Sequence, residues 1–523
     1  MLLFPPERNI LRTSIHVLQS DQWQLMYYFE DFKLDAWSII DFMLEGSAGT
    51  KIELAVGECV KDGRIDRNPG GSKIFQTNEI ILHGGIENVR FVFAPHNAPA
   101  GLPRGLKSPF EVEIAPVRYA EVCGDCKVIE VKRTPLYPEC FNDEDSDFVS
   151  NDEILNQVWE MCKYSMKATA PFGVFIDGER ERAPYEGDAY INQLGWFCCC
   201  TDGNIPRRTL EYLFHCHTWP YEWFLLMPQM VKDYLLYTGD TDFLPEALPH
   251  LEKCLLYDYL DDEGLLETKE NSNIRVIVDW PPAERDDYEF GKTDLVPNCY
   301  RYRALQVMAE LAGDDKYLIE AEKIKKLLRS KMMKNGIFVD SSDSSHTSLH
   351  TSIFALLAGI GNIAECPLIE EKGMACSVYA SQFLLDVCFQ NGMEQYAKNL
   401  LVSKDIRSWY NMIAKGATIS MEAWDDSFKP NQDWNHAWGA APANIIPRQI
   451  GGIRPVEYGF RSFIFDPHAA DLQYFYLKHP TPFGAIKVNY SCGIADLTVP
   501  EGTKAFYKGT VLLPGKHRIH LKG

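Results

Sequence analysis

The sequence lacks an excess of positive charge. Its 523 residues include 52 lysines and arginines against 73 aspartates and glutamates, a formal net charge of −21. A field of this sign repels phosphate groups, so we expect binding neither to nucleic acids nor to anionic membranes. A run of about 18 apolar residues is also missing, which predicts that no segment spans a membrane. Residues 1–20 lack the apolar core of a signal peptide, which favours a cytoplasmic location.

Several common motifs are missing as well. We find no serine-hydrolase, P-loop, Rossmann or HExxH signature, which weakens the case for those enzyme classes. Cys123 and Cys126 have CxxC spacing, but the second pair that a zinc site needs is missing, so we expect a hairpin there. The consecutive cysteines 198–200 are typical of thiols buried as small hydrophobes. No loop has the spacing of calcium ligands. We therefore predict neither a metal nor a cofactor.

Hydrophobic periodicity divides the chain into regions. Residues 1–135 alternate apolar and polar positions between turn-rich stretches, which predicts an N-terminal β-sandwich. The acidic, proline-containing stretch 136–150 is predicted to be an exposed linker. Residues 151–460 follow the helical period, and residues 461–523 return to alternation, which indicates a small C-terminal β-sandwich. The chain is therefore expected to have several domains.

About a dozen amphipathic helices are expected between residues 151 and 460. In the segment 314–333, for example, Tyr317, Ala321, Ile324 and Leu328 fall on one face. Some 300 residues of paired helices bury their apolar faces most economically in an (α/α)6 barrel, with six outer and six inner helices. An open superhelix is the competing arrangement, although no repeat of fixed period supports it.

The densest cluster of charge within the helical region spans residues 177–188. It contains seven charged side chains between apolar flanks, namely Asp177, Glu179, Arg180, Glu181, Arg182, Glu186 and Asp188. Carboxyl groups this close raise one another's pKa, whereas arginines lower it, so one site can hold a protonated and an ionised carboxyl together. An ion-pair network at the start of a helix is the structural alternative.

A second cluster places Glu422 beside Trp424 and before His436. Sugars stack on tryptophan faces through their C–H groups, so acidic, tryptophan-rich loops suggest carbohydrate chemistry. Trp223 and Trp280 lie next to acidic residues in two further segments and are candidates for the same role. Burial in the core is the alternative for each of these rings.

Glycoside hydrolysis needs two carboxyl groups, one that protonates the leaving oxygen and one that activates water or attacks the sugar. The best candidates are Glu181 and Glu422. Because they are 241 residues apart, only a closed fold brings them together. A separation of roughly 6.5–9.5 Å between the two groups is expected for an inverting enzyme, and ~5 Å for a retaining one.

These motifs, Asp177 to Ala189 and Glu422 to Asp425 with Asn435-His436, resemble those of the α-L-rhamnosidases. That family consists of inverting glycoside hydrolases with an (α/α)6 barrel, and the resemblance extends over nearly the whole chain. The first motif is one residue shorter here, with Gly178-Glu179 after the leading aspartate where the family usually has Cys-Pro.

The resemblance implies a role for each matching residue. Glu181 would be the general acid, and Glu422 the base that activates water. The residues implied to bind substrate are Asp177, Arg182, Tyr185, Asp188, Trp280 and His436, to which the aromatic clusters add Trp223 and Trp424.

The expected reaction is the release of terminal α-L-rhamnose from a small carbohydrate substrate. Three alternatives remain open: an (α/α)6-barrel glycosidase for another neutral or deoxy sugar, a sugar epimerase, and a sugar-binding protein without catalysis. The epimerase is disfavoured, because such enzymes rely on paired histidines and His436 is the sole histidine in the acidic clusters. The oligomeric state is not predicted.

Overall fold

A computed structural model describes residues 14–20, 23–97, 105–268 and 275–521. The chain forms two compact units, one made of residues 1–101 and 106–136 and the other of residues 102–105 and 137–523. Among the helices of the described residues, none combines the length and the apolar character needed to cross a bilayer.

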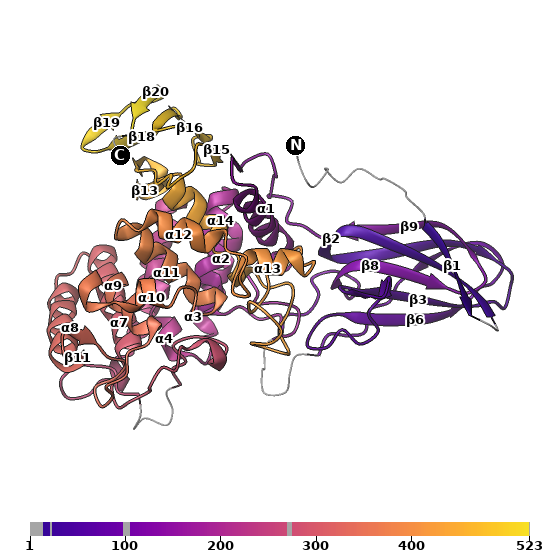
Figure 1. Cartoon of the computed structure of the whole chain (residues 1–523), viewed down its shortest axis with the longest axis horizontal. Helices are drawn as coiled ribbons and strands as arrows, with labels where there is room; N and C mark the ends of the chain where they lie inside the picture. The colour runs from indigo at the N-terminus through magenta and orange to yellow at the C-terminus, as the bar shows by residue number, and fades with distance from the viewer. Residues whose placement is uncertain (1–13, 21–22, 98–104, 269–274, 522–523) are drawn as a thin grey trace. The chain divides into compact units, whose positions relative to one another are not determined.

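The N-terminal unit is built from antiparallel strands around one long strand, β2 (Figure 1). The first part of β2 pairs with β1 and β8, and its last part pairs with β7 and β9. Alternation explains the core, because Ile52, Leu54 and Val56 of β3 are buried. The strands are β1 (Ser14–Ser20), β2 (Trp23–Gly46), β3 (Lys51–Gly57), β4 (Val60–Lys61), β5 (Arg64–Ile65), β6 (Phe75–Ile81), β7 (Gly85–Arg90), β8 (Ala115–Cys123) and β9 (Lys127–Pro135).

The second unit is mostly helical. Its helices are α1 (Glu153–Ala168), α2 (Glu186–Cys199), α3 (Asn204–His215), α4 (Tyr221–Phe224), α5 (Met227–Thr238), α6 (Phe243–Lys253), α7 (Leu295–Ala312), α8 (Lys316–Met332), α9 (Leu349–Leu357), α10 (Leu368–Glu371), α11 (Val378–Gln390), α12 (Glu394–Leu401), α13 (Trp409–Ala414) and α14 (Pro442–Ile445). The short strands β11 (Met333–Lys334) and β12 (Ile337–Phe338) follow α8. The helix predicted at 314–333 is confirmed as α8.

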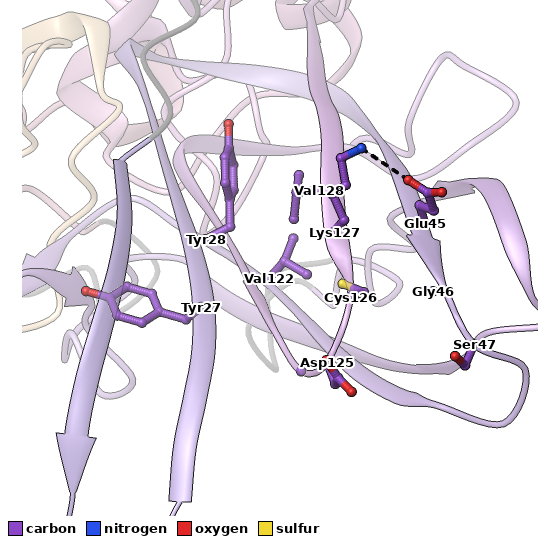
Figure 2. A pocket seen from close by; sticks show the side chains of 11 residues that line it. Tyr27, Tyr28, Glu45, Gly46, Ser47, Val122, Asp125, Cys126, Lys127 and Val128 are labelled. Atoms are coloured by element: carbon purple, nitrogen blue, oxygen red, sulfur yellow. Dashed lines mark hydrogen bonds and ion pairs between the residues drawn. The ribbon is translucent and has the colours of Figure 1, made fainter.

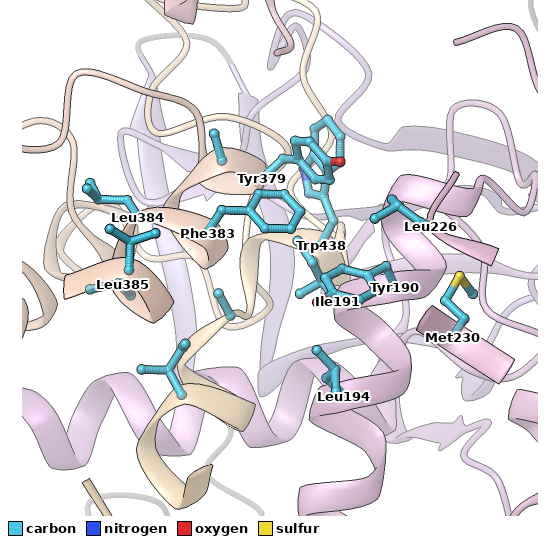
Figure 3. Packing of buried hydrophobic residues seen from close by; sticks show 14 of the residues in the cluster. Tyr190, Ile191, Leu194, Leu226, Met230, Tyr379, Phe383, Leu384, Leu385 and Trp438 are labelled. Atoms are coloured by element: carbon cyan, nitrogen blue, oxygen red, sulfur yellow. The ribbon is translucent and has the colours of Figure 1, made fainter. Parts of the chain in front are cut away.

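Six of these helices contact one another in a closed series. α2 contacts α5, and the series continues through α7, α9 and α11 to α14, which contacts α2 again. Burial on all sides explains why α2 and α11 are apolar around most of their circumference. Between them, the ring of Tyr190 stacks on that of Phe383, with centroids 5.7 Å apart (Figure 3). A closed series of helices therefore surrounds a packed aromatic interior.

Strands close the chain in two sheets, one with the order β10-β15-β16-β17-β20 and the other β13-β14-β18-β19. They are β10 (Asp147–Ser150), β13 (Ile453–Glu457), β14 (Ser462–Phe465), β15 (Tyr474–His479), β16 (Ile486–Ser491), β17 (Ile494–Val499), β18 (Lys504–Tyr507), β19 (Thr510–Leu512) and β20 (Gly515–His520).

The structure differs from the sequence-based boundaries in two places. The predicted linker 136–150 contains β10, because Phe148 of this acidic segment is buried against β15. The C-terminal strands also begin at Ile453, before the predicted residue 461. One local prediction is confirmed, because the cysteines 198–200 are buried. The hairpin predicted at Cys123 and Cys126 is wrong: the two cysteines lie on either side of the turn between β8 and β9, but β8 pairs with β2 and β3 whereas β9 pairs with another part of β2, so these two strands are not paired with each other in the described sheet.

Candidate active site

The charged motif forms a tight loop before α2. The backbone N–H of Asp177 donates to Ala183 O at 2.9 Å, and the Asp177 carboxylate accepts from the Ala183 N–H at 2.9 Å. Arg182 has a φ of +48°, the left-handed conformation that this tight turn requires. Asp177 is consequently buried within the loop, whereas the side chains of Arg180 and Glu181 are 15% and 14% exposed.

Arg182 pairs with Glu179 inside the loop. Its Nε and Nη2 atoms contact the two Glu179 oxygens at 2.9 and 2.6 Å, and both side chains are buried. Arg182, predicted to hold the sugar, is therefore engaged by a protein carboxylate. The structural alternative for this motif, an ion-pair network, is thus present in part.

Arg180 joins the two candidate catalytic carboxylates. Its Nη2 atom lies 3.1 Å from Glu181 Oε1 and 2.9 Å from Glu422 Oε1, and its Nη1 atom lies 3.1 Å from Glu422 Oε2. Because Glu181 Oε1 and Glu422 Oε1 both contact Nη2 of Arg180, these two oxygens lie at most about 6 Å apart. The fold therefore brings together two glutamates that are 241 positions apart in the sequence.

Glu422 is buried among cationic and N–H groups. Beyond Arg180, it lies 3.2 Å from Lys429 Nζ and accepts from the Asp433 backbone N–H at 3.1 Å. Burial acts to raise the pKa of Glu422, but the charges of Arg180 and Lys429 outweigh it and hold the pKa below its ordinary value. Glu422 is consequently ionised at neutral pH.

The other buried carboxyl groups near Glu181 and Glu422 have raised pKa values, in contrast to the lowered pKa of Glu422. Burial, reinforced by neighbouring carboxylates, raises the pKa of Asp177 and Asp188 well above their ordinary values. His436 Nδ1 lies 3.5 Å from Asp188 Oδ1, and burial lowers the pKa of this histidine to about 3. The site therefore holds the neutral His436 and two carboxyl groups that resist ionisation beside the ionised Glu422.

Tyr185 connects the loop to the aromatic interior. Its hydroxyl donates to Glu181 Oε2 at 2.5 Å, and its ring lies edge-on to Trp223 with centroids 6.2 Å apart. Trp223 is buried directly over Gly187, where a Cβ atom would lie 2.7 Å from the indole ring. Trp223 is thus part of the packing beneath the loop.

Two other predicted tryptophans have different surroundings. Trp424 is completely buried, donates its indole N–H to Cys376 O at 2.7 Å and packs against Trp409. Trp280 and Trp219 are both half-buried, and their rings lie edge-on to each other with centroids 5.9 Å apart. Of the predicted stacking residues, Trp424 is therefore a core residue, whereas Trp280 is only partly buried.

Three residues at the site were not predicted. Arg180, Lys429 and Asp433 all contact Glu422. Arg180 lies inside the charged motif, so its position was a usable signal. Lys429 and Asp433 lie between the two halves of the second cluster and carried no comparable signal.

A separate hollow of about 360 Å³ lies in the N-terminal unit (Figure 2). It is lined by Glu45 and Gly46 at the end of β2, by Ser47 after it, and by the segment Gly124 to Lys127 between β8 and the start of β9. Each of the candidate catalytic residues belongs to the other unit, so this hollow is not part of the site.

Comparison with known proteins identifies the family of this chain. Residues 143–450 match the bacterial α-L-rhamnosidase six-hairpin glycosidase domain, and residues 452–522 match the bacterial α-L-rhamnosidase C-terminal domain. The chain belongs to this family. No curated protein matches its sequence.

Solved structures of α-L-rhamnosidases share the fold. The GH78 family rhamnosidase of Bacillus sp. GL1 has a TM-score of 0.72 at 19% identity over 93% of this chain and 52% of that one. The α-L-rhamnosidase from Dictyoglumus thermophilum has a TM-score of 0.75 at 16% identity, over 97% and 62%. The Streptomyces avermitilis α-L-rhamnosidase, complexed with L-rhamnose, has a TM-score of 0.72 at 17% identity, over 94% and 52%. This chain thus spans between about half and three fifths of the length of these α-L-rhamnosidases.

Proposed function

We propose that this protein is an exo-acting glycoside hydrolase that releases terminal α-L-rhamnose from oligosaccharides or glycosides with inversion. Glu181 is the general acid, and Glu422 is the base that activates water. The observation that carries the proposal is the single guanidinium of Arg180, which contacts both carboxyl groups. Membership of the α-L-rhamnosidase family supports the choice of sugar.

In this proposal the helices from α1 to α14 form an (α/α)6 barrel, and the strands before residue 136 form a β-sandwich. The C-terminal strands, which begin with β13 at Ile453, form a second β-sandwich. The closed series of contacts from α2 through α5, α7, α9, α11 and α14 supports the inner ring of such a barrel. A closed ring places the loops before successive inner helices around one opening, where Glu181 and Glu422 meet.

The surroundings of the two glutamates favour this division of roles. Glu181 is the more exposed, with 14% of its side chain accessible against 2% for Glu422, so it suits the group that meets the leaving oxygen. The lowered pKa of Glu422 keeps it ionised, as a base must be. Both Glu422 oxygens accept hydrogen bonds from Arg180, so the guanidinium must leave at least one of them before water is activated.

The acid is tested with substrates that differ in leaving group. In Glu181→Gln we expect turnover of an alkyl rhamnoside to fall by about 10²–10⁴-fold, and turnover of an activated aryl rhamnoside to fall much less. Glu422→Gln should lose both activities, because each needs activated water. Glu322→Gln, at an exposed position of α8, is the matched control. Normal cleavage of both substrates by Glu181→Gln would show that another group is the acid.

The stereochemistry is decided by the product. NMR of the first sugar released from an α-L-rhamnoside should show the β-anomer. The nearest oxygens of Glu181 and Glu422 lie at most about 6 Å apart, below the roughly 6.5–9.5 Å expected between the carboxyl groups of an inverting enzyme, so the anomer is the deciding measurement.

The second candidate is a sugar-binding protein without catalysis. The engagement of both Glu422 oxygens by Arg180 favours it, because a base held in this way is not free to take a proton. Calorimetric binding of L-rhamnose without release of sugar from any aryl glycoside would support this candidate over the hydrolase.

A further inference from the structure

The segment before Trp280 has a strained backbone. Val278 has a φ of +62°, and a β-branched residue rarely adopts this left-handed conformation because its Cβ atom crowds the backbone. The side chains of Ile277 and Val278 are buried, so the strain does not lie at an exposed loop tip. Such a conformation persists only where surrounding contacts enforce it.

Glu222 of α4 supplies such a contact. Its Oε1 atom accepts hydrogen bonds from the backbone N–H groups of Ile277 at 2.6 Å and Val278 at 2.8 Å. The residue is 1% exposed, and burial raises its pKa to about 7 although the two N–H groups act in the opposite direction. A buried carboxyl is tolerated where donors reach it, so Glu222 and the left-handed segment stabilise each other.

Asp279 holds the same segment from its other side. Its Oδ1 atom accepts the Trp280 backbone N–H at 2.8 Å and the Ser377 hydroxyl. Its Oδ2 atom accepts the Ser377 backbone N–H at 2.9 Å and lies 2.6 Å from His350 Nε2. The backbone on both sides of Val278 is therefore anchored to buried polar groups.

The anchored segment leads to Trp280, which forms a partly accessible aromatic pair with Trp219. Trp280 and Trp219 lie edge-on at 5.9 Å, and the Arg275 guanidinium lies 4.4 Å from the Trp219 ring centroid. An indole held in one orientation offers a flat apolar face to the C–H groups of a sugar without losing side-chain freedom on binding.

We propose that Glu222 is a positioning residue: by accepting the backbone N–H groups of Ile277 and Val278, it fixes the strained conformation of Val278 and orients Trp280 against the sugar of the substrate. This inference rests on the proposed function. Glu222 does not touch the substrate itself, and it shares no hydrogen bond with Glu181 or Glu422 among the described residues. Its loss should therefore weaken substrate binding more than it slows the chemical step.

The kinetic test removes the acceptor and then restores it. In Glu222→Met we expect KM for an aryl α-L-rhamnoside to rise about tenfold, equivalent to ~1.4 kcal/mol, with kcat changed less than about threefold. Glu222→Gln should stay within about twofold of the wild-type KM, because its carbonyl oxygen still accepts both N–H groups. Glu322→Met, at an exposed position, is the matched control. If Glu222→Met does not fold, Glu222→Asp replaces it, since the shorter side chain withdraws the acceptor.

A second variant tests the strain directly. Glycine adopts a φ of +62° without strain, so adding Val278→Gly to Glu222→Met should lower KM back toward the wild-type value. A residue that merely supports the core would give no such recovery. An unchanged KM in Glu222→Met, or no recovery in the double variant, would overturn the positioning role.

A readout independent of activity separates this inference from the proposed function. In protein labelled with 5-fluorotryptophan, Trp280→Phe assigns the Trp280 signal among the 11 tryptophans. We expect Glu222→Met to shift or broaden this ¹⁹F signal and Glu222→Gln to leave it in place. An unmoved signal in Glu222→Met would overturn the inference even if the enzyme is active. If the wild type neither binds nor cleaves rhamnosides, the proposed function fails, while the ¹⁹F signal still decides whether Glu222 orients Trp280.

Discussion

Replacing Arg180 with methionine tests the electrostatic centre of the site. Glu422 would lose the hydrogen bonds to both of its oxygens, at 2.9 and 3.1 Å, and keep only Lys429 and the Asp433 N–H. Removing one partner of a buried ion pair costs about 3–5 kcal/mol. Because Arg180 is 15% exposed and Lys429 remains, we expect a loss near the lower end, about 3 kcal/mol in the free energy of unfolding.

The pH dependence of this loss carries the sharper test. In the wild type the pKa of Glu422 is lowered, so its contribution to stability is present above the pKa of the unfolded chain and is lost as the pH falls through the folded value. Without Arg180, the effect of burial is less opposed, so the pKa of Glu422 in the folded protein rises. The cost of burying the ionised Glu422 carboxylate in the variant then increases as the pH rises. The difference from wild type should therefore be larger near pH 8 than near pH 5.

Urea unfolding of both proteins, followed by near-ultraviolet circular dichroism, measures this difference. Arg329→Met, which breaks the more exposed pair with Glu365, is the matched control and should cost no more than about 1 kcal/mol. Adding Glu422→Gln to Arg180→Met should recover part of the loss, because no buried charge is then left unpaired. A loss from Arg180→Met that equals the control, or one that is the same at both pH values, would refute the electrostatic reasoning.

Two further substitutions probe the groups around the carboxyl pair. Asp188→Asn should raise the free energy of unfolding near pH 8 more than near pH 5, because the raised pKa of Asp188 makes its ionised form unfavourable in the folded state. Urea titrations at both pH values measure this difference. An equal change in the free energy of unfolding at both pH values would contradict the prediction. Gly178→Ala should destabilise the protein by about 1–3 kcal/mol, because its Cβ atom would lie 2.6 Å from Oδ2 of the buried Asp433. Thermal unfolding measures that loss, which should shrink in the double variant with Asp433→Ala and would be unexplained if it did not.

Gly178 also gives a physical reason for the unusual form of the first motif. The chain has Gly178-Glu179 where the family usually has Cys-Pro, and the sequence alone offered no reason for the difference. In the structure Asp433 occupies the space that a side chain at 178 would fill, and Glu179 neutralises the buried Arg182. The shorter motif is therefore matched to its surroundings.

The sequence by itself determined the features that repeat with a regular period or lie close together in the chain. Alternating apolar residues predicted the strands, the helical period predicted α8, and the composition of residues 177–188 identified the charged loop. Periodicity and local composition can be recognised in a short stretch of sequence, because the geometry of a strand or helix determines which neighbouring side chains face the core. The buried strand β10 escaped prediction because its pairing with β15, more than 300 residues away, outweighs its acidic neighbours.

Only the tertiary structure decided which members of each cluster work together. Arg180 and Arg182 are two positions apart, yet one contacts Glu181 and Glu422 while the other pairs with Glu179. The same applies to the tryptophans, since Trp424 is completely buried and Trp280 is partly exposed. Exposure and ion pairing depend on what distant segments bring to a side chain, and a linear pattern of residue types does not record those distances.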